Sequence, residues 1–156
     1  SGRVWTVEEL RQVAKFAARH DLILVSDEVH ADLVYAGTTH VPMDVAAPEH
    51  RDRMVTLFAA SKTFNLAGLR VGQMIIPDEK LRTQMADRLT ALNYDVTSLG
   101  AVASQAAYSP EGNTWVAAQM DYLQENRRLF DEGVNAIPGG WSMPSPISAT
   151  FIRASM

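Results

Sequence analysis

The chain has 156 residues, of which 47% are apolar and 21% charged, a length and composition typical of one globular domain. Its net charge of −4 gives no electrostatic argument for binding nucleic acid or an anionic membrane surface. The absence of cysteine excludes disulfides and thiolate catalysis, and no apolar run approaches the roughly 20 residues of a membrane span. We therefore expect a cytoplasmic protein without nucleic-acid or membrane partners.

The N-terminal segment predicts a helix followed by a buried strand. Thr6-Val7-Glu8-Glu9 has the pattern of a capping box, and apolar residues then recur at helical spacing from Leu10 to Ala17, so a helix is expected over about 6–20. The short apolar run 22–25, LILV, is typical of a strand buried on both faces, as in a parallel sheet.

Two further strands are predicted, and the lengths of their connections indicate their directions. Residues 54–58, MVTLF, form the second strand, and the 28 residues before it are long enough for a crossover between parallel strands. Residues 71–76, VGQMII, form the third strand after only 12 residues with no clear helix, which favours an antiparallel return. The sequence thus predicts an α/β fold with part of a mixed, mostly parallel sheet flanked by helices.

The C-terminal part is predicted to be mainly helical. Pro77-Asp78 indicates the start of a helix that continues to about Leu92. A helix is expected within 99–108, a break over 109–113, and a long helix over about 114–136. The segment 149–154, ATFIRA, is typical of a strand.

Charged side chains follow two of the predicted strands. Asp27 comes after the first strand and Lys62 after the second, and ligands of open α/β sheets bind beyond the carboxyl ends of the strands. An acid could hold a cationic ring nitrogen, a lysine could form a Schiff base, and the guanidinium of Arg70 could hold a phosphate. A ring nitrogen, an aldehyde and a phosphate on one small molecule describe pyridoxal 5′-phosphate (PLP).

Two motifs carry a family resemblance. SDEVHADLVY (26–35) and SKTFNLAGLRVG (61–72) resemble the fold-type I PLP-dependent enzymes, the aspartate aminotransferase superfamily. Within it, the Asp-Glu-x-His and Ser-Lys-Thr-Phe-Asn motifs are most similar to the cystathionine β-lyase-like C–S lyase branch. The N-terminal SGRVWTVEEL resembles the segment that comes after this family's Asn-Pro pair.

The resemblance implies a role for each of five residues. Lys62 would be the catalytic Schiff-base lysine and the proton shuttle at the substrate α-carbon, and Asp27 would pair with the pyridinium nitrogen. Arg70 would bind the cofactor phosphate, with Ser61 as a second donor to it. His30 falls where aminotransferases carry a tyrosine that hydrogen-bonds the ring's phenolic oxygen. The histidines recur every ten residues, which matches no metal-ligand spacing, so no metal site is expected.

The sequence also departs from the family pattern. Ala59 stands where many relatives have a phosphate-binding serine, and residues 97–98 stand where an Asn-Pro pair is common. The family's glycine-rich phosphate turn and ring-stacking aromatic belong upstream of the first residue, and its carboxylate-binding arginine beyond the last. We therefore expect a fragment, with 1–108 the C-terminal part of the PLP-binding large domain and 109–156 a linking helix and the start of a small α+β domain.

Three functions are compatible with these motifs. The first is C–S β-elimination from cystathionine-like amino acids to pyruvate, ammonia and a thiol, by an enzyme that is a homodimer at full length. The second is class I/II transamination. The third belongs to another class of protein, the aminotransferase-like effector domain of a transcription regulator. His30 and the KTFN motif favour the lyase, and the fragment alone is expected to be inactive.

Overall fold

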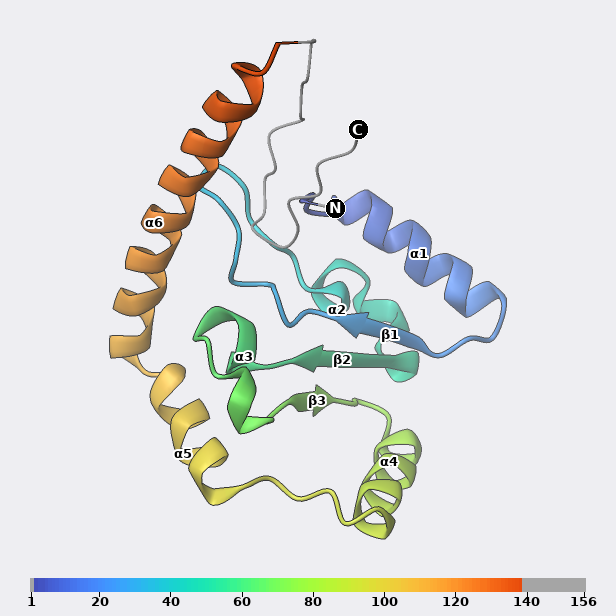
Figure 1. Ribbon diagram of the computed structural model, residues 1–156. Helices are drawn as coiled ribbons and strands as arrows, with labels where there is room; N and C mark the ends of the chain where they lie inside the picture. The colour runs from blue at the N-terminus through green and yellow to red at the C-terminus, as the bar shows by residue number, and fades with distance from the viewer. Residues whose placement is uncertain (1, 139–156) are drawn as a thin grey trace.

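The computed structural model describes residues 2–138 and has an α/β architecture, as the sequence predicts (Figure 1). Its three strands form one sheet in the order β1-β2-β3. The elements are α1 (Val7–Arg19), β1 (Leu24–Asp27), α2 (Met43–Ala46), η1 (Pro48–Arg53), β2 (Met54–Phe58), α3 (Ala60–Thr63), η2 (Ala67–Leu69), β3 (Gln73–Ile75), α4 (Glu79–Ala91), α5 (Ser98–Ala107) and α6 (Pro110–Asn135). The predicted strand at 149–154 lies outside the described residues.

The strand directions are those that the connection lengths predict. β1 and β2 are parallel, with Leu24 opposite Met54 and Asp27 opposite Leu57, whereas β2 and β3 are antiparallel. β2 has the expected bounds, while β1 is displaced toward Asp27 and β3 is shorter than expected. In Figure 1 the arrows of β1 and β2 both point toward α6, so their carboxyl ends share one edge of the sheet.

The N-terminal helix forms as expected and covers the main apolar core. Thr6 Oγ1 accepts the Glu9 N–H, and the Glu9 carboxylate accepts the Thr6 N–H at 2.8 Å, which completes the capping box. The core cluster consists of Leu10, Ala14, Met43, Ala46, Ala47 and Met54. Its three alanines are almost wholly buried, and small side chains of this kind allow close packing of α1 on α2.

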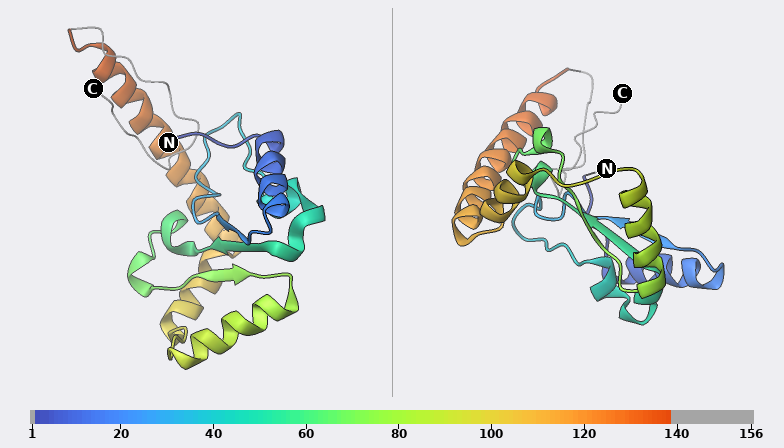
Figure 2. Two further views of the ribbon diagram at one scale, coloured as in Figure 1. Left: turned by 90° about the vertical axis from the view of Figure 1, so that its right-hand side faces the viewer. Right: turned by 90° about the horizontal axis from the view of Figure 1, so that it is seen from below.

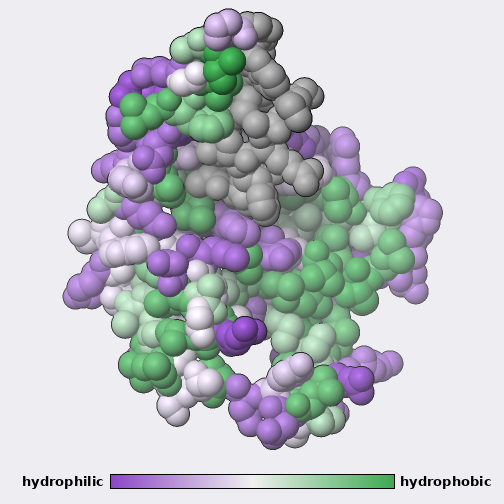
Figure 3. Space-filling model, in the orientation of Figure 1, coloured by the Kyte–Doolittle hydropathy of each residue, from purple (hydrophilic) through white to green (hydrophobic). Residues whose placement is uncertain are grey.

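The prediction that the first strand is buried on both faces is wrong. Val25 is 56% exposed, and Leu22 and Ile23 just before β1 are also exposed. Within residues 2–138 the only strand beside β1 is β2, so alternate side chains of β1 have no covering layer. Figure 3 shows an apolar area over this part of the molecule.

The helices after β3 begin at capping residues, two of which differ from the expected starts. Asp78 is the N-cap of α4, so Pro77 precedes the helix rather than occupying its first turn. α6 begins at Pro110 rather than near residue 114, because Ser109 caps it and proline is favourable at the first helical position. No helix among residues 2–138 is long and apolar enough to cross a membrane.

Two glycines allow α5 and α6 to pack closely on the segment that follows β2. A Cβ at Gly100 would lie 2.2 Å from Val71 Cγ2, and one at Gly112 would lie 1.8 Å from the Ala107 carbonyl oxygen. Phe64 stacks on the Trp115 ring of α6 at a centroid distance of 5.7 Å. α5 and α6 therefore support the 60–71 segment from outside the sheet, and Figure 2 shows them from two further directions.

Candidate cofactor site

The site is built at the carboxyl ends of the two parallel strands. Asp27 is the last residue of β1, and Lys62 lies in the one-turn helix α3 directly after β2. Because β1 and β2 are parallel and adjacent, the chain brings both residues to the same edge of the sheet. This is the arrangement expected if one ligand is to contact both strand ends.

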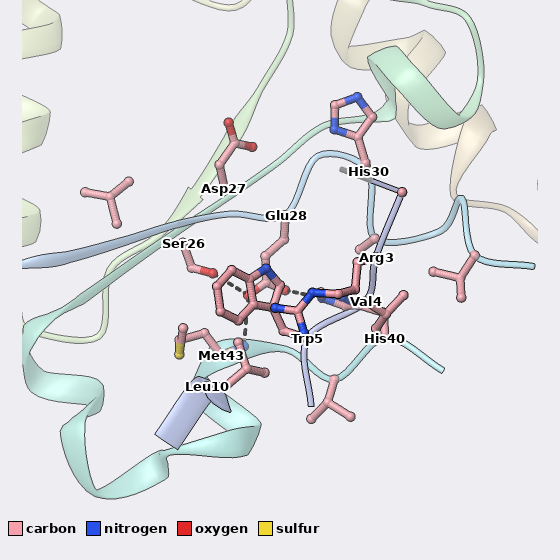
Figure 4. Close-up of a pocket in the computed structure, with 15 residues that line it drawn as sticks. Arg3, Val4, Trp5, Leu10, Ser26, Asp27, Glu28, His30, His40 and Met43 are labelled. Carbon is pink, nitrogen blue, oxygen red and sulfur yellow. Dashed lines mark hydrogen bonds and ion pairs between the residues drawn. The ribbon is translucent and has the colours of Figure 1, made fainter. Parts of the chain in front are cut away.

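The side chain of Asp27 is exposed and lies in a turn. Its Oδ1 accepts the Val29 N–H at 3.3 Å, and in Figure 4 its carboxylate points away from Glu28. Successive residues of a strand point to opposite faces, so the pair Asp27-Glu28 divides into one outward and one inward carboxylate. His30 lies on the same side as Asp27 in this view.

Glu28 is a site residue that the sequence analysis missed. It is 9% exposed, and it accepts hydrogen bonds from the Ser26 hydroxyl and the Met43 N–H, both at 2.9 Å. His40 Nε2 also lies 2.9 Å from its Oε2. Burial opposes ionisation, but the hydrogen bonds from His40, Met43 and Ser26 outweigh it and lower the pKa of the Glu28 carboxyl. The alternation of side chains after the strand was the signal that could have indicated an inward acid.

His30 is half-buried and lies within electrostatic reach of both predicted cofactor residues. Burial is the main cause that lowers the pKa of its imidazole, and the positive charge of Lys62 lowers it further, while the carboxylate of Asp27 opposes both. The imidazole is therefore neutral over a wider pH range than an exposed histidine. Asp27 and His30 also line a common cavity of about 340 Å³ (Figure 4).

The other predicted residues lie outside the lining of this cavity, on the segment after β2. Lys62 and Arg70 are exposed, and Ser61 is partly buried. The Ser61 hydroxyl donates to the Val71 carbonyl at 3.3 Å, which is long for an O–H···O bond and therefore weak. Its proton is free to turn to a stronger acceptor such as phosphate.

Arg70 adopts an unusual backbone conformation. Its φ of 52° and ψ of 48° are left-handed, whereas the flanking Gly68 and Gly72 have no positive φ. A non-glycine residue in this region carries a cost of about 1–2 kcal/mol, and such strain is concentrated at functional sites. The turn therefore presents an arginine where glycine would be the easier choice.

The charges at this edge fit a small zwitterionic cofactor. Within residues 2–138, no ion pair within 4 Å involves Asp27, Lys62 or Arg70. One uncommitted carboxylate, one amine and one guanidinium at one sheet edge are the donor set that a pyridinium nitrogen, an aldehyde and a phosphate require. The same residues form no cluster of three metal-ligating side chains, within the part of the chain that is described.

The fold and this donor set are those of a PLP-dependent aminotransferase-type protein. The chain belongs to the aminotransferase class I and II family, whose model matches residues 1–153. The predicted resemblance to fold-type I PLP enzymes and to their cystathionine β-lyase-like branch is confirmed, and the family's cofactor is PLP.

Individual relatives include both lyases and aminotransferases. The chain is 35% identical over 127 residues to cystathionine β-lyase PatB of Bacillus subtilis, covering 81% of this chain and 33% of the relative. It is 27% identical to an aspartate aminotransferase of Geobacillus stearothermophilus over 88% of this chain and 33% of the relative. Its structure matches a PLP-bound C–S lyase from Staphylococcus hominis with a TM-score of 0.85 and 32% identity, over 95% of this chain and 37% of that one. The chain thus spans about a third of the length of the curated relatives it matches.

Proposed function

We propose that this chain is the cofactor-binding part of a PLP-dependent enzyme that cleaves the C–S bond of cystathionine-like L-amino acids. The observation that carries the proposal is the pair of parallel strand ends bearing Asp27 and Lys62, with His30 in the field of both charges. The 35% identity with a cystathionine β-lyase supports the choice of reaction. In this reaction the substrate and one water give pyruvate, ammonia and a thiol.

Each residue has a role that its chemistry supports. PLP, when bound, withdraws electrons from the α-carbon of an amino acid attached to it. Lys62 attaches the cofactor aldehyde and then takes the α-proton as a base. Asp27 accepts a hydrogen bond from the protonated ring nitrogen and keeps that nitrogen charged. Arg70 binds the phosphate, assisted by the Ser61 hydroxyl, and neutral His30 donates an N–H to the ring's phenolic oxygen.

Transamination is the second candidate, because the chain is also similar to an aspartate aminotransferase. Both reactions begin when Lys62 removes the α-proton. They diverge in the next step: elimination breaks the Cβ–S bond and releases a thiol, whereas transamination moves the proton held by Lys62 to the cofactor and releases a 2-oxo acid. Supplying cystathionine and measuring thiol against 2-oxo acid transfer separates them.

We also propose that residues 1–108 belong to the large cofactor domain, that residues from 109 onward lead into a second domain, and that the enzyme is a homodimer. The matched region is only 33% of the B. subtilis relative, so the 156 residues alone are expected to retain PLP poorly and to turn over little substrate.

Borohydride reduction of the PLP-loaded full-length protein, followed by peptide mapping, tests the assignment of Lys62. The chain offers two internal controls, Lys15 in α1 and Lys80 in α4. The label is expected on Lys62 alone and is expected to vanish in Lys62→Met. A label on either control lysine, or none on Lys62, would refute the proposed site.

A further inference from the structure

A side-chain hydrogen bond joins the two halves of the site. Thr63 Oγ1 donates to Asp32 Oδ2 at 2.8 Å across 31 residues of sequence. Thr63 is 0% exposed and directly follows Lys62, while Asp32 lies two residues after His30. The bond therefore connects the helix that carries the amine to the turn that carries the imidazole.

Asp32 is a fixed acceptor, because the turn that carries it is itself ordered. The Ala31 N–H donates to the Glu28 carbonyl at 2.9 Å, and the Leu33 N–H donates to the His30 carbonyl at 3.0 Å. Leu33 is buried and anchors the end of the turn. A charge-assisted bond to such an acceptor is stronger and more directional than one between neutral groups.

The helix that carries Lys62 depends on contacts of this kind. α3 has four residues and no side-chain cap, and a single helical turn has no stability of its own. Phe64, beyond the end of α3, is held by its stacking on Trp115 of α6. On the side of the His30 turn, Thr63 provides the corresponding tie.

We propose that Asp32 and Thr63 are a positioning pair that holds the Lys62 amine at a fixed place relative to His30 and Asp27. The importance of this pair for catalysis rests on the proposed function, but its effect on the geometry does not. Neither residue is a catalytic residue, because each acts through its neighbour: Thr63 through Lys62, and Asp32 through the His30 turn.

His30 reports the position of Lys62 without any cofactor, because the positive charge of Lys62 lowers the pKa of the imidazole. Asp27 acts in the opposite direction, and Arg3, Glu28 and His40 line the cavity that His30 also lines. These four groups are retained in every variant of the test. If the Lys62 amine moves away, the pKa of His30 rises.

The test is an NMR titration of His30 in the full-length, cofactor-free protein, with the resonance assigned through His30→Gln. Lys62→Met gives the full effect of removing the cation. Thr63→Val deletes only the hydroxyl and is expected to raise the pKa of His30 by part of that amount, on the order of half a unit. Thr63→Ser keeps the hydroxyl and is expected to restore the original value. Thr56→Val makes the same change in a buried threonine of β2 and is expected to leave the value unchanged.

Asp32→Ala is a second variant in case Thr63→Val does not fold, since Asp32 lies in a surface turn. Loss of a carboxylate by itself lowers the pKa of a nearby histidine, so a rise in this variant reports movement of Lys62. An unchanged pKa of His30 in Thr63→Val and Asp32→Ala would overturn the proposal, and so would an unchanged value in Lys62→Met. A rise in the variants of a protein that takes up no PLP would support the pair and count against the proposed function.

Discussion

Replacing Gly112 with alanine tests how tightly α6 is packed on the site. The new Cβ would lie 1.8 Å from the Ala107 carbonyl oxygen and 3.2 Å from Phe64 Cε1. The first contact is with backbone, which cannot rotate away, so the first turn of α6 has to retreat by roughly 1 Å to reach an ordinary contact distance. Overpacking of this kind costs about 1–3 kcal/mol, occasionally more, and the better helix propensity of alanine offsets up to about 1 kcal/mol.

We therefore expect Gly112→Ala to lower the free energy of unfolding by about 2 kcal/mol and Tm by roughly 4–8 °C. Gly133→Ala is the matched control in the same helix, because a Cβ there meets nothing within 4 Å. It is expected to raise stability by up to about 1 kcal/mol. Thermal and urea unfolding followed by circular dichroism measure both. Changes of the same sign in the two variants, or an unaffected Gly112→Ala protein, would show that the close packing at the junction of α5 and α6 is wrong.

Three further outcomes are expected. Asp27→Asn is expected to reduce turnover far more than PLP affinity, whereas Arg70→Ala is expected mainly to weaken PLP binding; titration of PLP absorbance alongside turnover measures both, and equal losses of affinity would contradict the division of roles. Ser61→Ala is expected to change Tm little, because its bond to Val71 is weak, and to reduce PLP affinity less than Arg70→Ala does. Glu28→Gln is expected to lower stability at neutral pH and to flatten its decline in acid, as measured by urea unfolding from pH 3 to pH 7. The pKa of Glu28 is lowered below 4.5 by folding, so its contribution is present above that pH and lost as pH falls through the folded value; an acid profile identical to that of the wild-type protein would argue against this role.

The sequence by itself determined the features that depend on local patterns. The capping box of α1, the bounds of β2 and the directions of the three strands were all predictable. Neighbouring residues satisfy a helix end directly, and the length of a connection limits whether the next strand is parallel or antiparallel. The two motifs around Asp27 and Lys62 were sufficient to indicate the PLP family, because several functional residue types recur there at fixed spacing.

Only the tertiary structure decided how these pieces meet. Pro110 and Gly112 look like a break in sequence, yet they start α6, because proline suits the first turn and glycine alone fits beside Ala107. Glu28 is buried by partners up to 15 residues away, and the bond between Asp32 and Thr63 spans 31 residues. A single sequence does not say which distant side chains become neighbours, because that depends on how the strands align and how the helices pack on them.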